Sequence, residues 1–255
     1  MKFDTGAPVN ITMLGAGGTG GHVAPNLYRL LHGLGREARL TVADGDTVEP
    51  GNLVRQNFTS RDLGRNKARA LAERYASAFG MEAGYLPEYV ENAELLKRLT
   101  GPIPYHVYGA HGNPVRKDGT AILLGCVDNN RSRKLCHEVF MEARNLVYID
   151  SGNGMYSGQV VCGVRRNGRT ISKPAGSLYP EILEDTDRFP SELSCTEAAE
   201  ASPQSIAANI TAAASIMSFL YNILVVGSLE TTSVTFSTRS VNTKPATAKP
   251  CRSKN

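Results

Sequence analysis

The chain has 255 residues, of which 41% are hydrophobic and 20% are charged, a composition typical of a soluble protein with one substantial α/β core. A formal net charge of +4 is too small to indicate nucleic-acid binding, because nucleic-acid binders usually present a concentrated basic face. None of the five cysteines forms a C-x-x-C pair, so we expect neither a disulfide framework nor a structural zinc site, and the reducing cytoplasm is the expected compartment.

Short apolar stretches and amphipathic helical patterns alternate through the first 145 residues. Strands are expected at Ile11–Leu14, Arg39–Ala43, Ala83–Leu86 and Ala121–Val127. Helices are expected at His22–Leu34, Arg65–Phe79, Ala93–Leu99 and Arg131–Ala143. This alternation predicts an α/β fold, with a Rossmann-like, mostly parallel sheet and helices on both of its faces. In such sheets, ligands bind at the carboxyl ends of the strands.

The first candidate site residues lie in the glycine run G-A-G-G-T-G-G, from Gly15 to Gly21, between the first expected strand and the first expected helix. A glycine-lined turn at a helix N-terminus lets a phosphate group approach backbone N–H groups. The run therefore predicts a nucleotide site that Gly15, Gly17, Gly18 and Gly20 help to form. Alone, this motif is a weak signal, because dinucleotide-binding folds carry it as well.

The second candidate segment, D-G-D-T-V-E-P-G-N-L-V-R-Q, runs from Asp44 to Gln56 and begins where the second expected strand ends. Asp44 is placed to accept a hydrogen bond from a ribose hydroxyl group. The loop then carries Asn52, Arg55 and Gln56, and the next expected helix delivers Lys67. A dinucleotide fold needs only the acidic residue, so the two added cations suggest a triphosphate.

The third candidate segment, C-V-D-N-N-R-S-R at Cys126 to Arg133, puts Asp128 between an expected strand and an expected helix. A carboxylate at this point can hold Mg²⁺ against nucleotide phosphates. The alternative is structural, with Asp128 or Asn130 capping the first turn of the helix. All three segments begin at the carboxyl end of an expected strand, and this shared position supports one common site.

After residue 145 the pattern changes from alternation to consecutive strands. Leu146–Ile149 and Met155–Val164 are expected strands. The Asn167-Gly168 pair that follows is typical of a tight hairpin turn, so we expect an antiparallel extension of the sheet. Residues 172–203 then form a long crossover loop without clear periodicity, and loops of this length are usually functional or mobile.

The segment from Ile206 to Gly227 contains no charged residue and is long enough to cross a bilayer, which takes about 20 residues. Polar residues are scattered through it and alanines dominate its first half, which favours a helix buried against the sheet and against a second subunit. We therefore expect a homodimer, with a membrane span as the alternative.

A strand at Ser233–Ser237 is the last expected element of the fold. Residues 1–241 are thus expected to form a single domain that includes the crossover loop. The Lys-, Pro- and Thr-rich residues 242–255 are expected to form a disordered tail.

Together these segments resemble the ThiF/MoeB/ubiquitin-activating-enzyme (UBA/THIF-type) family of ATP-dependent adenylating proteins, over residues 10–165. The matching motifs are Gly15-Ala16-Gly17-Gly18-Thr19-Gly20, Asp44-x-Asp46-x-Val48-Glu49-x-x-Asn52-Leu53-x-Arg55-Gln56, Gly64-x-x-Lys67-Ala68, Asp128-Asn129, Tyr148-x-Asp150-Ser151-Gly152 and Gly158-Gln159-Val160. The resemblance implies that ATP is bound by Gly15, Gly17, Gly18, Gly20, Asp44, Asp46, Asn52, Arg55, Gln56, Lys67, Asp128 and Asn129.

The resemblance implies a reaction as well as a site. Arg55 and Lys67 would surround the triphosphate, and Asp128 would hold Mg²⁺ near the reacting phosphorus atom. The C-terminal carboxylate of a small ubiquitin-like β-grasp protein would attack the α-phosphate, with pyrophosphate as the leaving group and an acyl-adenylate as the product. Because a carboxylate is a poor nucleophile towards a polyanion, cations and fixed orientation would supply the catalysis.

The crossover loop carries a second point of resemblance. P-S-E-L-S-C-T, from Pro190 to Thr196, looks like the family's P-x-C-T segment, in which a cysteine receives the activated tail as a thioester. This would make Cys195 a catalytic residue. The spacing differs from the family's, and Glu192 and Glu197 would raise the pKa of the thiol, so an incidental loop cysteine is the alternative.

Two family features have no counterpart in the sequence. Only Met1 to Asn10 precede the first expected strand, so an arginine that many members send from an N-terminal helix into the partner's ATP site is missing, with Arg131 and Arg133 as candidate substitutes. The paired C-x-x-C zinc site is also absent, so no structural zinc is expected. The segment S-C-T-E-A-A-E-A-S-P-Q-S, from Ser194, is similar to small ThiF-like proteins of plasmid-borne PRTRC gene sets.

Two other functions remain open at the level of sequence. The first is an NAD(P)-dependent oxidoreductase, which would leave Arg55, Lys67 and Asp128 without a role. Its acid–base residues would have to come from His106, His111 and His137, of which the first two lie in a Gly/Pro-rich loop expected at the surface. The second is a catalytically weakened, nucleotide-binding scaffold subunit, suggested by the missing N-terminal arginine.

Overall fold

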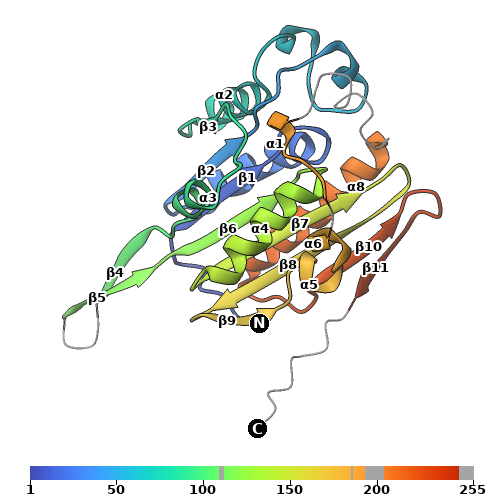
Figure 1. Ribbon diagram of the computed structural model, residues 1–255. Coiled ribbons are helices and arrows are strands. Elements are labelled where there is room, and N and C mark those ends of the chain that lie inside the picture. Colours follow the sequence, from blue (N-terminus) through green and yellow to red (C-terminus); the bar gives the residue numbers. More distant parts are fainter. Residues whose placement is uncertain (109–111, 185, 193–203, 247–255) are drawn as a thin grey trace.

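The structure is a computed structural model that describes residues 1–108, 112–184, 186–192 and 204–246 (Figure 1). Its main element is a mixed sheet with strand order β11-β10-β8-β7-β6-β1-β2-β3. The parallel strands are β1 (Val9–Leu14), β2 (Ala38–Ala43), β3 (Gly84–Leu86), β6 (Thr120–Gly125) and β7 (Leu146–Asn153). The antiparallel strands are β8 (Ser157–Arg166), β9 (Arg169–Ser172), β10 (Ser233–Ser237) and β11 (Asn242–Ala246). The predicted Rossmann-like fold with an antiparallel extension is confirmed.

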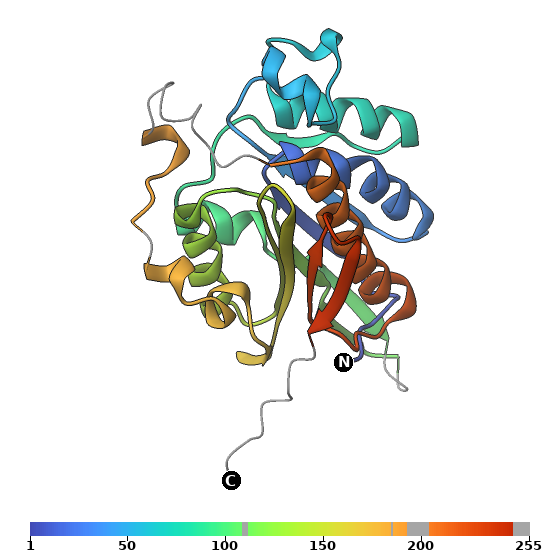
Figure 2. The ribbon, with the colours of Figure 1, turned by 90° about the vertical axis from the view of Figure 1, so that its right-hand side faces the viewer.

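Helices cover both faces of the sheet, on either side of the strands in Figure 2. One face carries α1 (Gly18–Gly33), α2 (Lys67–Phe79) and α8 (Ile206–Tyr221), with α1 in contact with both others. The other face carries α3 (Ala93–Leu99), α4 (Asn130–Glu142), α5 (Ala175–Leu178) and α6 (Glu181–Glu184). Along β1, Met13 belongs to the first hydrophobic cluster and Leu14 to the second, because successive strand side chains point to opposite faces.

Capping residues set the limits of the helices that begin near the carboxyl ends of the strands. The side chain of Asn66 accepts a hydrogen bond from the backbone N–H of Arg69 and starts α2, and Gly80, with φ of +63°, ends it. The side chain of Asn129 likewise accepts from the backbone N–H of Ser132 at 2.8 Å and starts α4. The cap of α4 is therefore Asn129, and the alternative in which Asp128 or Asn130 caps this helix is wrong.

The apolar segment forms α8 and one further turn at Asn222–Val226. By length and composition, Ile206–Val226 could span a membrane, with a mean hydropathy of 1.6 in a window that is 44% buried. In the fold, α8 packs against α1, β7 and β8 and contributes to the main hydrophobic cluster. Its outer face is apolar too, because Ile210 and Tyr221 are about half exposed, at 48% and 52%.

The expected disorder from residue 242 onward is wrong for residues 242–246. These residues form β11 and pair with β10 in antiparallel register, from Ser237 opposite Asn242 to Ser233 opposite Ala246. The composition is poor in apolar residues, but strand pairing uses backbone groups, and an edge strand tolerates Pro245. Residues 247–255 lie outside the part of the chain that the structure describes.

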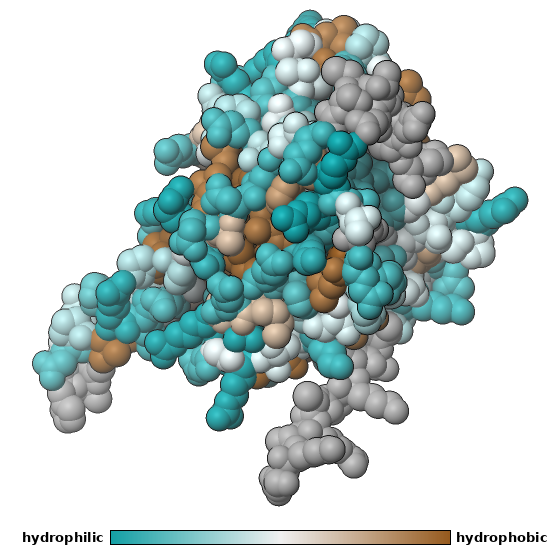
Figure 3. All heavy atoms as spheres, in the orientation of Figure 1, coloured by the Kyte–Doolittle hydropathy of each residue, from teal (hydrophilic) through white to brown (hydrophobic). Residues whose placement is uncertain are grey.

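Two segments expected as loops contain regular structure. Within the crossover loop 172–203 lie α5, α6 and a 3-10 turn at Pro190–Glu192. The Gly/Pro-rich segment after α3 forms a hairpin of β4 (Pro104–Tyr108) and β5 (Pro114–Asp118), which stands out from the body in Figure 3. His106 is exposed on this hairpin, and His111 lies outside the described residues.

Candidate functional site

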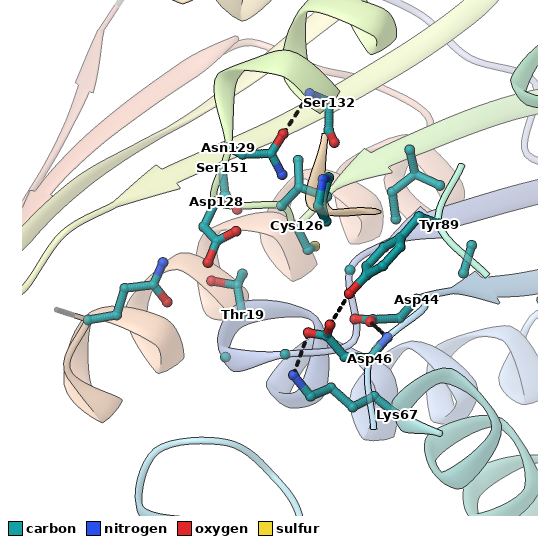
Figure 4. A pocket seen from close by; sticks show the side chains of 18 of the residues that line it. Thr19, Asp44, Asp46, Lys67, Tyr89, Cys126, Asp128, Asn129, Ser132 and Ser151 are labelled. Carbon is teal, nitrogen blue, oxygen red and sulfur yellow. Dashed lines mark hydrogen bonds and ion pairs between the residues drawn. The ribbon is translucent and has the colours of Figure 1, made fainter. Parts of the chain in front are cut away.

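A cavity of about 450 Å³ opens at the carboxyl ends of β1, β2, β6 and β7 (Figure 4). The predicted site residues that line it are Gly15, Gly17, Gly18, Asp44, Asp46, Arg55, Gln56, Lys67, Asp128 and Asn129. Gly20 and Asn52 do not line it, and Cys195 lies outside the described residues. Residues that the sequence analysis did not assign to the site also line it, among them Thr19, Tyr89, Val90, Asn153, Arg188 and Gln204.

The glycine loop depends on close backbone approaches. Gly15 has φ of +90°, and a Cβ atom there would lie 2.5 Å from the carbonyl oxygen of Cys126. A Cβ atom at Gly20 would lie 1.9 Å from the carbonyl oxygen of Gly15. Because Gly20 has no side chain, the first turn of α1 packs closely against the loop. Gly20 therefore supports the shape of the site without lining the cavity.

Asp44 joins the glycine loop to the end of β2. Its Oδ2 accepts a hydrogen bond from the backbone N–H of Ala16 at 2.6 Å, and its Oδ1 accepts from the backbone N–H of Asp46 at 2.9 Å. Burial, with the neighbouring Asp46 carboxylate, raises the pKa of Asp44 to about 6. Each oxygen keeps a lone pair beyond its backbone bond, so this carboxylate can also accept from a ligand hydroxyl.

Lys67 and Asp46 form an ion pair on the wall of the cavity. The Lys67 Nζ lies 2.7 Å from Asp46 Oδ2, and the lysine side chain is only 7% exposed. The Tyr89 hydroxyl donates to the other Asp46 oxygen, and burial and this bond raise the pKa of Tyr89 (Figure 4). Tyr89 follows β3, and the rule that ligand residues follow parallel strands could have found it.

Arg55, Gln56 and Asn52 belong to one short turn. Asn52 Oδ1 accepts from the backbone N–H of Glu49 at 2.9 Å, so Asn52 fixes the turn that presents Arg55. Arg55 is half-buried, and its Nη1 makes a long contact of 3.5 Å to Oε1 of Gln204. Asn52 is thus a structural residue of the loop.

Asp128 is exposed in the cavity between β6 and α4. Its carboxylate forms no hydrogen bond or ion pair with any residue that the structure describes. A solvent-accessible carboxylate of this kind is suited to a hard divalent cation. Within the described residues, no group of three or more His, Cys, Asp and Glu side chains is arranged to hold a metal ion by itself.

Neither Arg131 nor Arg133, the two arginines expected to serve the ATP site, lines the cavity. Arg133 is buried and bonded through Nε and Nη2 to the Asp150 carboxylate, which also accepts from the Tyr148 hydroxyl at 2.8 Å. Arg131 stacks on the ring of Phe189, 4.6 Å from its centroid. The expectation that Arg133 serves as the substitute is wrong, because its guanidinium neutralises a carboxylate that is fully buried.

The crossover segment 186–192 passes along the rim of the cavity. On one side, Asp187 Oδ2 accepts from the backbone N–H of Asn130 at the start of α4, at 2.8 Å. On the other side, the backbone N–H of Ser191 donates to Oε1 of Glu91 at 3.1 Å. Arg188, between these two contacts, lines the cavity.

The described cysteine in the cavity is Cys126. Burial raises the pKa of its thiol to about 12, with a smaller contribution from Asp150. The thiol is therefore protonated at neutral pH, and Cys126 is unsuited to act as a nucleophile.

The comparisons with known proteins agree with this geometry. The model of the ThiF family matches residues 7–253. No curated protein sequence matches the chain significantly.

Several solved structures share the fold. E. coli MccB with ATP has 15% sequence identity and a TM-score of 0.63, over 98% of this chain and 67% of MccB. PaaA has 15% identity and a TM-score of 0.62, over 94% of this chain and 64% of PaaA. E. coli MccB with AMPCPP and MccA has 16% identity and a TM-score of 0.61, over 98% of this chain and 66% of MccB. The chain thus spans about two thirds of the length of these proteins.

We predict that Arg133→Met lowers the free energy of unfolding by about 3–5 kcal/mol, because it leaves the buried Asp150 carboxylate without its cation. Urea denaturation measures this change. The matched control is Lys97→Ala, which removes an exposed ion pair with Glu142 and should change stability little. A loss below about 1 kcal/mol for Arg133→Met would show that Tyr148 alone satisfies Asp150.

Proposed function

This chain belongs to the ThiF family, and we propose that it uses ATP to activate a carboxylate. A carboxylate oxygen would attack the α-phosphorus, the bond from that phosphorus to the bridging oxygen of the β-phosphate would break, and pyrophosphate would leave with the electron pair. The observation that carries this proposal is the meeting of the glycine loop, Asp44, Arg55, Lys67 and Asp128 around one cavity.

The cavity has the chemistry of an adenine nucleotide site. Its volume of about 450 Å³ lies within the usual range for ligand pockets. Apolar side chains that suit the base lie beside the acidic strand end: Leu14, Ala43, Val90 and Val127. Asp44 would accept from the ribose, and the N-terminus of α1 would receive a phosphate group. The residues present therefore fit ATP.

The charges of the cavity suit a triphosphate bound with Mg²⁺. Arg55 and Lys67 would offset phosphate charge, and Lys67 would share its ammonium group between Asp46 and the nucleotide. Asp128 would hold Mg²⁺, which when bound supplies further positive charge at the phosphates. The chain's own residues orient the reactants and stabilise developing charge, which is how a site makes a weak nucleophile react.

We propose that the activated carboxylate is the C-terminus of a small ubiquitin-like β-grasp protein. This rests on the resemblance of the motifs at Asp44–Gln56 and Asp128 to those of the ThiF/MoeB/ubiquitin-activating-enzyme family. MccB, which shares the fold, has been solved with MccA and AMPCPP together, so a structurally similar protein binds a nucleotide and a second molecule at once. In a second step, the Cys195 thiolate would attack the acyl carbon of the adenylate and form a thioester, with AMP as the leaving group. Mass spectrometry with Mg-ATP and a β-grasp protein encoded nearby should then show a thiol-labile adduct that Cys195→Ser removes; an unchanged adduct would exclude this step.

The outer face of α8 supports the proposal of a homodimer. Ile206 and Ile210 are each 48% exposed and Tyr221 is 52% exposed on a helix that carries no charge. Sedimentation should show a dimer that Ile210→Glu dissociates, since a charge would enter an apolar interface. Monomeric wild-type protein would contradict this assembly.

A nucleotide-binding scaffold is the second candidate function. It is favoured by one observation: Arg133, which was expected to serve the ATP site, is instead engaged by the buried Asp150 carboxylate. Stabilisation by Mg-ATP without pyrophosphate exchange would support it. The ThiF family match leaves the oxidoreductase alternative without support.

We predict that Arg55→Ala and Asp128→Ala each lower ATP–pyrophosphate exchange by at least about 100-fold. The first variant removes a cation that would offset phosphate charge, and the second removes the carboxylate that would hold Mg²⁺ at the phosphates. The exchange is measured with Mg-ATP and the β-grasp partner. Arg98→Ala, at an exposed position on α3, is the matched control and should keep full activity. Full activity in both site variants would remove their assigned roles.

We predict that the affinity for Mg-ATP falls as the pH is lowered through about 6, because protonated Asp44 no longer accepts from a ribose hydroxyl. The loss should level off at about ten- to a hundredfold, the effect of one lost hydrogen bond to a charged group. The raised pKa also affects the stability of the protein without nucleotide. Asp44 contributes most to the free energy of unfolding at pH values below its ordinary pKa, and this contribution is lost as the pH rises through about 6.

Calorimetric titrations between about pH 7.5 and about pH 5 measure this dependence. Asp44→Asn serves as the control, because the nucleotide itself titrates in the same range. The variant should bind weakly at every pH and should lack the additional loss. Parallel pH profiles for both proteins would contradict the role of Asp44.

A further inference from the structure

The helix α8 carries one buried polar side chain whose presence the surrounding apolar residues do not explain. Asn209 is fully buried and lies on a helix whose neighbouring buried residues are Ala208, Ala212 and Ala213. Burying an amide group in apolar surroundings is costly unless the amide is hydrogen-bonded. Its Oδ1 has a partner, but its Nδ2 has none among the residues that the structure describes.

Asn209 is the inner end of a chain of side-chain hydrogen bonds. Asn153, at the end of β7, donates from Nδ2 to Oδ1 of Asn209 at 2.8 Å. Thr19, in the first turn of α1, donates from its hydroxyl to Oδ1 of Asn153 at 3.1 Å. The unpartnered Nδ2 of Asn209 lies against Gly18, where a Cβ atom would approach it to 2.3 Å. Three elements far apart in sequence thus meet at one point.

The outer end of this chain lies in the nucleotide cavity. Thr19, Asn153 and Gly18 line the cavity, with Asn209 behind them. The wall that they form is polar and uncharged, whereas the wall at β2 carries Asp44 and Asp46. Figure 4 shows the side chains of Thr19 and Asp128 among those that line this cavity. An acyl group held at the wall formed by Thr19, Asn153 and Gly18 would therefore meet uncharged donors.

We propose that Asn153 binds the oxygen of the carboxylate or acyl group that is being activated, and that Asn209 is the residue that positions it. An asparagine amide nitrogen carries two N–H groups, and Asn153 uses one of them for Asn209. The other is available to a ligand oxygen. Asn209 and Thr19 together fix the amide plane.

Uncharged donors suit this task for a physical reason. A guanidinium or ammonium group would form an ion pair with the attacking carboxylate and hold back the electron pair that must reach phosphorus. An amide N–H orients the oxygen with a weaker hydrogen bond and leaves it nucleophilic. Of the cations that line this cavity, Arg55 and Lys67 come from the loop and helix that would surround the phosphates, and Arg188 comes from the crossover segment.

The experiment compares two ligands that differ in the acyl group, and it rests on the proposed function. AMP fills the nucleotide part of the site, and 5′-O-(N-glycylsulfamoyl)adenosine adds a glycyl group in the position of an acyl-adenylate. Calorimetry on the full chain gives a Kd for each. The ratio of the Kd of AMP to the Kd of the glycyl compound measures recognition of the acyl group.

In wild-type protein the glycyl compound should bind more tightly. Asn153→Ala should lower the ratio of the two Kd values by about three- to tenfold, the effect of one lost hydrogen bond, and leave the Kd of AMP within about twofold. Asn209→Ala should do the same, and the double variant should show no further loss, because both act through one contact. Asn153 is half-buried, so its truncation tests the contact without disturbing the core.

Ser215→Ala is the matched control on α8, since the Ser215 hydroxyl donates only within the helix, to the carbonyl of Thr211 at 2.9 Å. It should change neither Kd. An unchanged ratio in Asn153→Ala would overturn the proposal, as would an equal weakening of both ligands by Asn209→Ala. Failure of wild-type protein to bind AMP, Mg-ATP and the glycyl compound would instead overturn the proposed function, and this inference with it.

Discussion

The Asp44 carboxylate holds the cavity together. It is buried at the end of β2, and its two oxygens accept from the backbone N–H groups of Ala16 and Asp46. These bonds fix the glycine loop against the neighbouring strand, so the first turn of α1 and the turn leading to Arg55 keep one relative position. Burial also raises the pKa of Asp44 to about 6, and the loop is thus held by a group that titrates near the physiological range.

The division of charge within the cavity follows from the fold. Asp44 and Asp46 follow β2, and Lys67, which pairs with Asp46, begins α2. Asp128 lies between β6 and α4, so these charges come from the parallel part of the sheet. Asn153 comes from the end of β7, where the sheet turns antiparallel, and its partner Asn209 comes from α8. The nucleotide and the acyl group are therefore assigned to opposite walls, each built by a different part of the chain.

The residues that sequence predicted best are those set by strand ends. Asp44 and Asp128 directly follow apolar strands, and a parallel sheet brings such ends together whatever the rest of the chain does. Asn209 was missed because its partner, Asn153, is distant in sequence and no local pattern records the contact, whereas Tyr89 was missed although it follows β3. β11 was missed because it pairs with β10 through backbone groups, and amino-acid composition does not indicate backbone hydrogen bonding.

The contact between Gly18 and Asn209 has an evolutionary consequence. A methyl group at residue 18 and an amide at residue 209 cannot occupy the same space, since the two would approach to 2.3 Å. A side chain at residue 18 therefore requires a smaller residue at 209, so the two positions form an epistatic pair that links the first turn of α1 to a helix nearly two hundred residues later. Among descendants of this chain, a larger residue in the loop should therefore appear after, and not before, a smaller one on the helix.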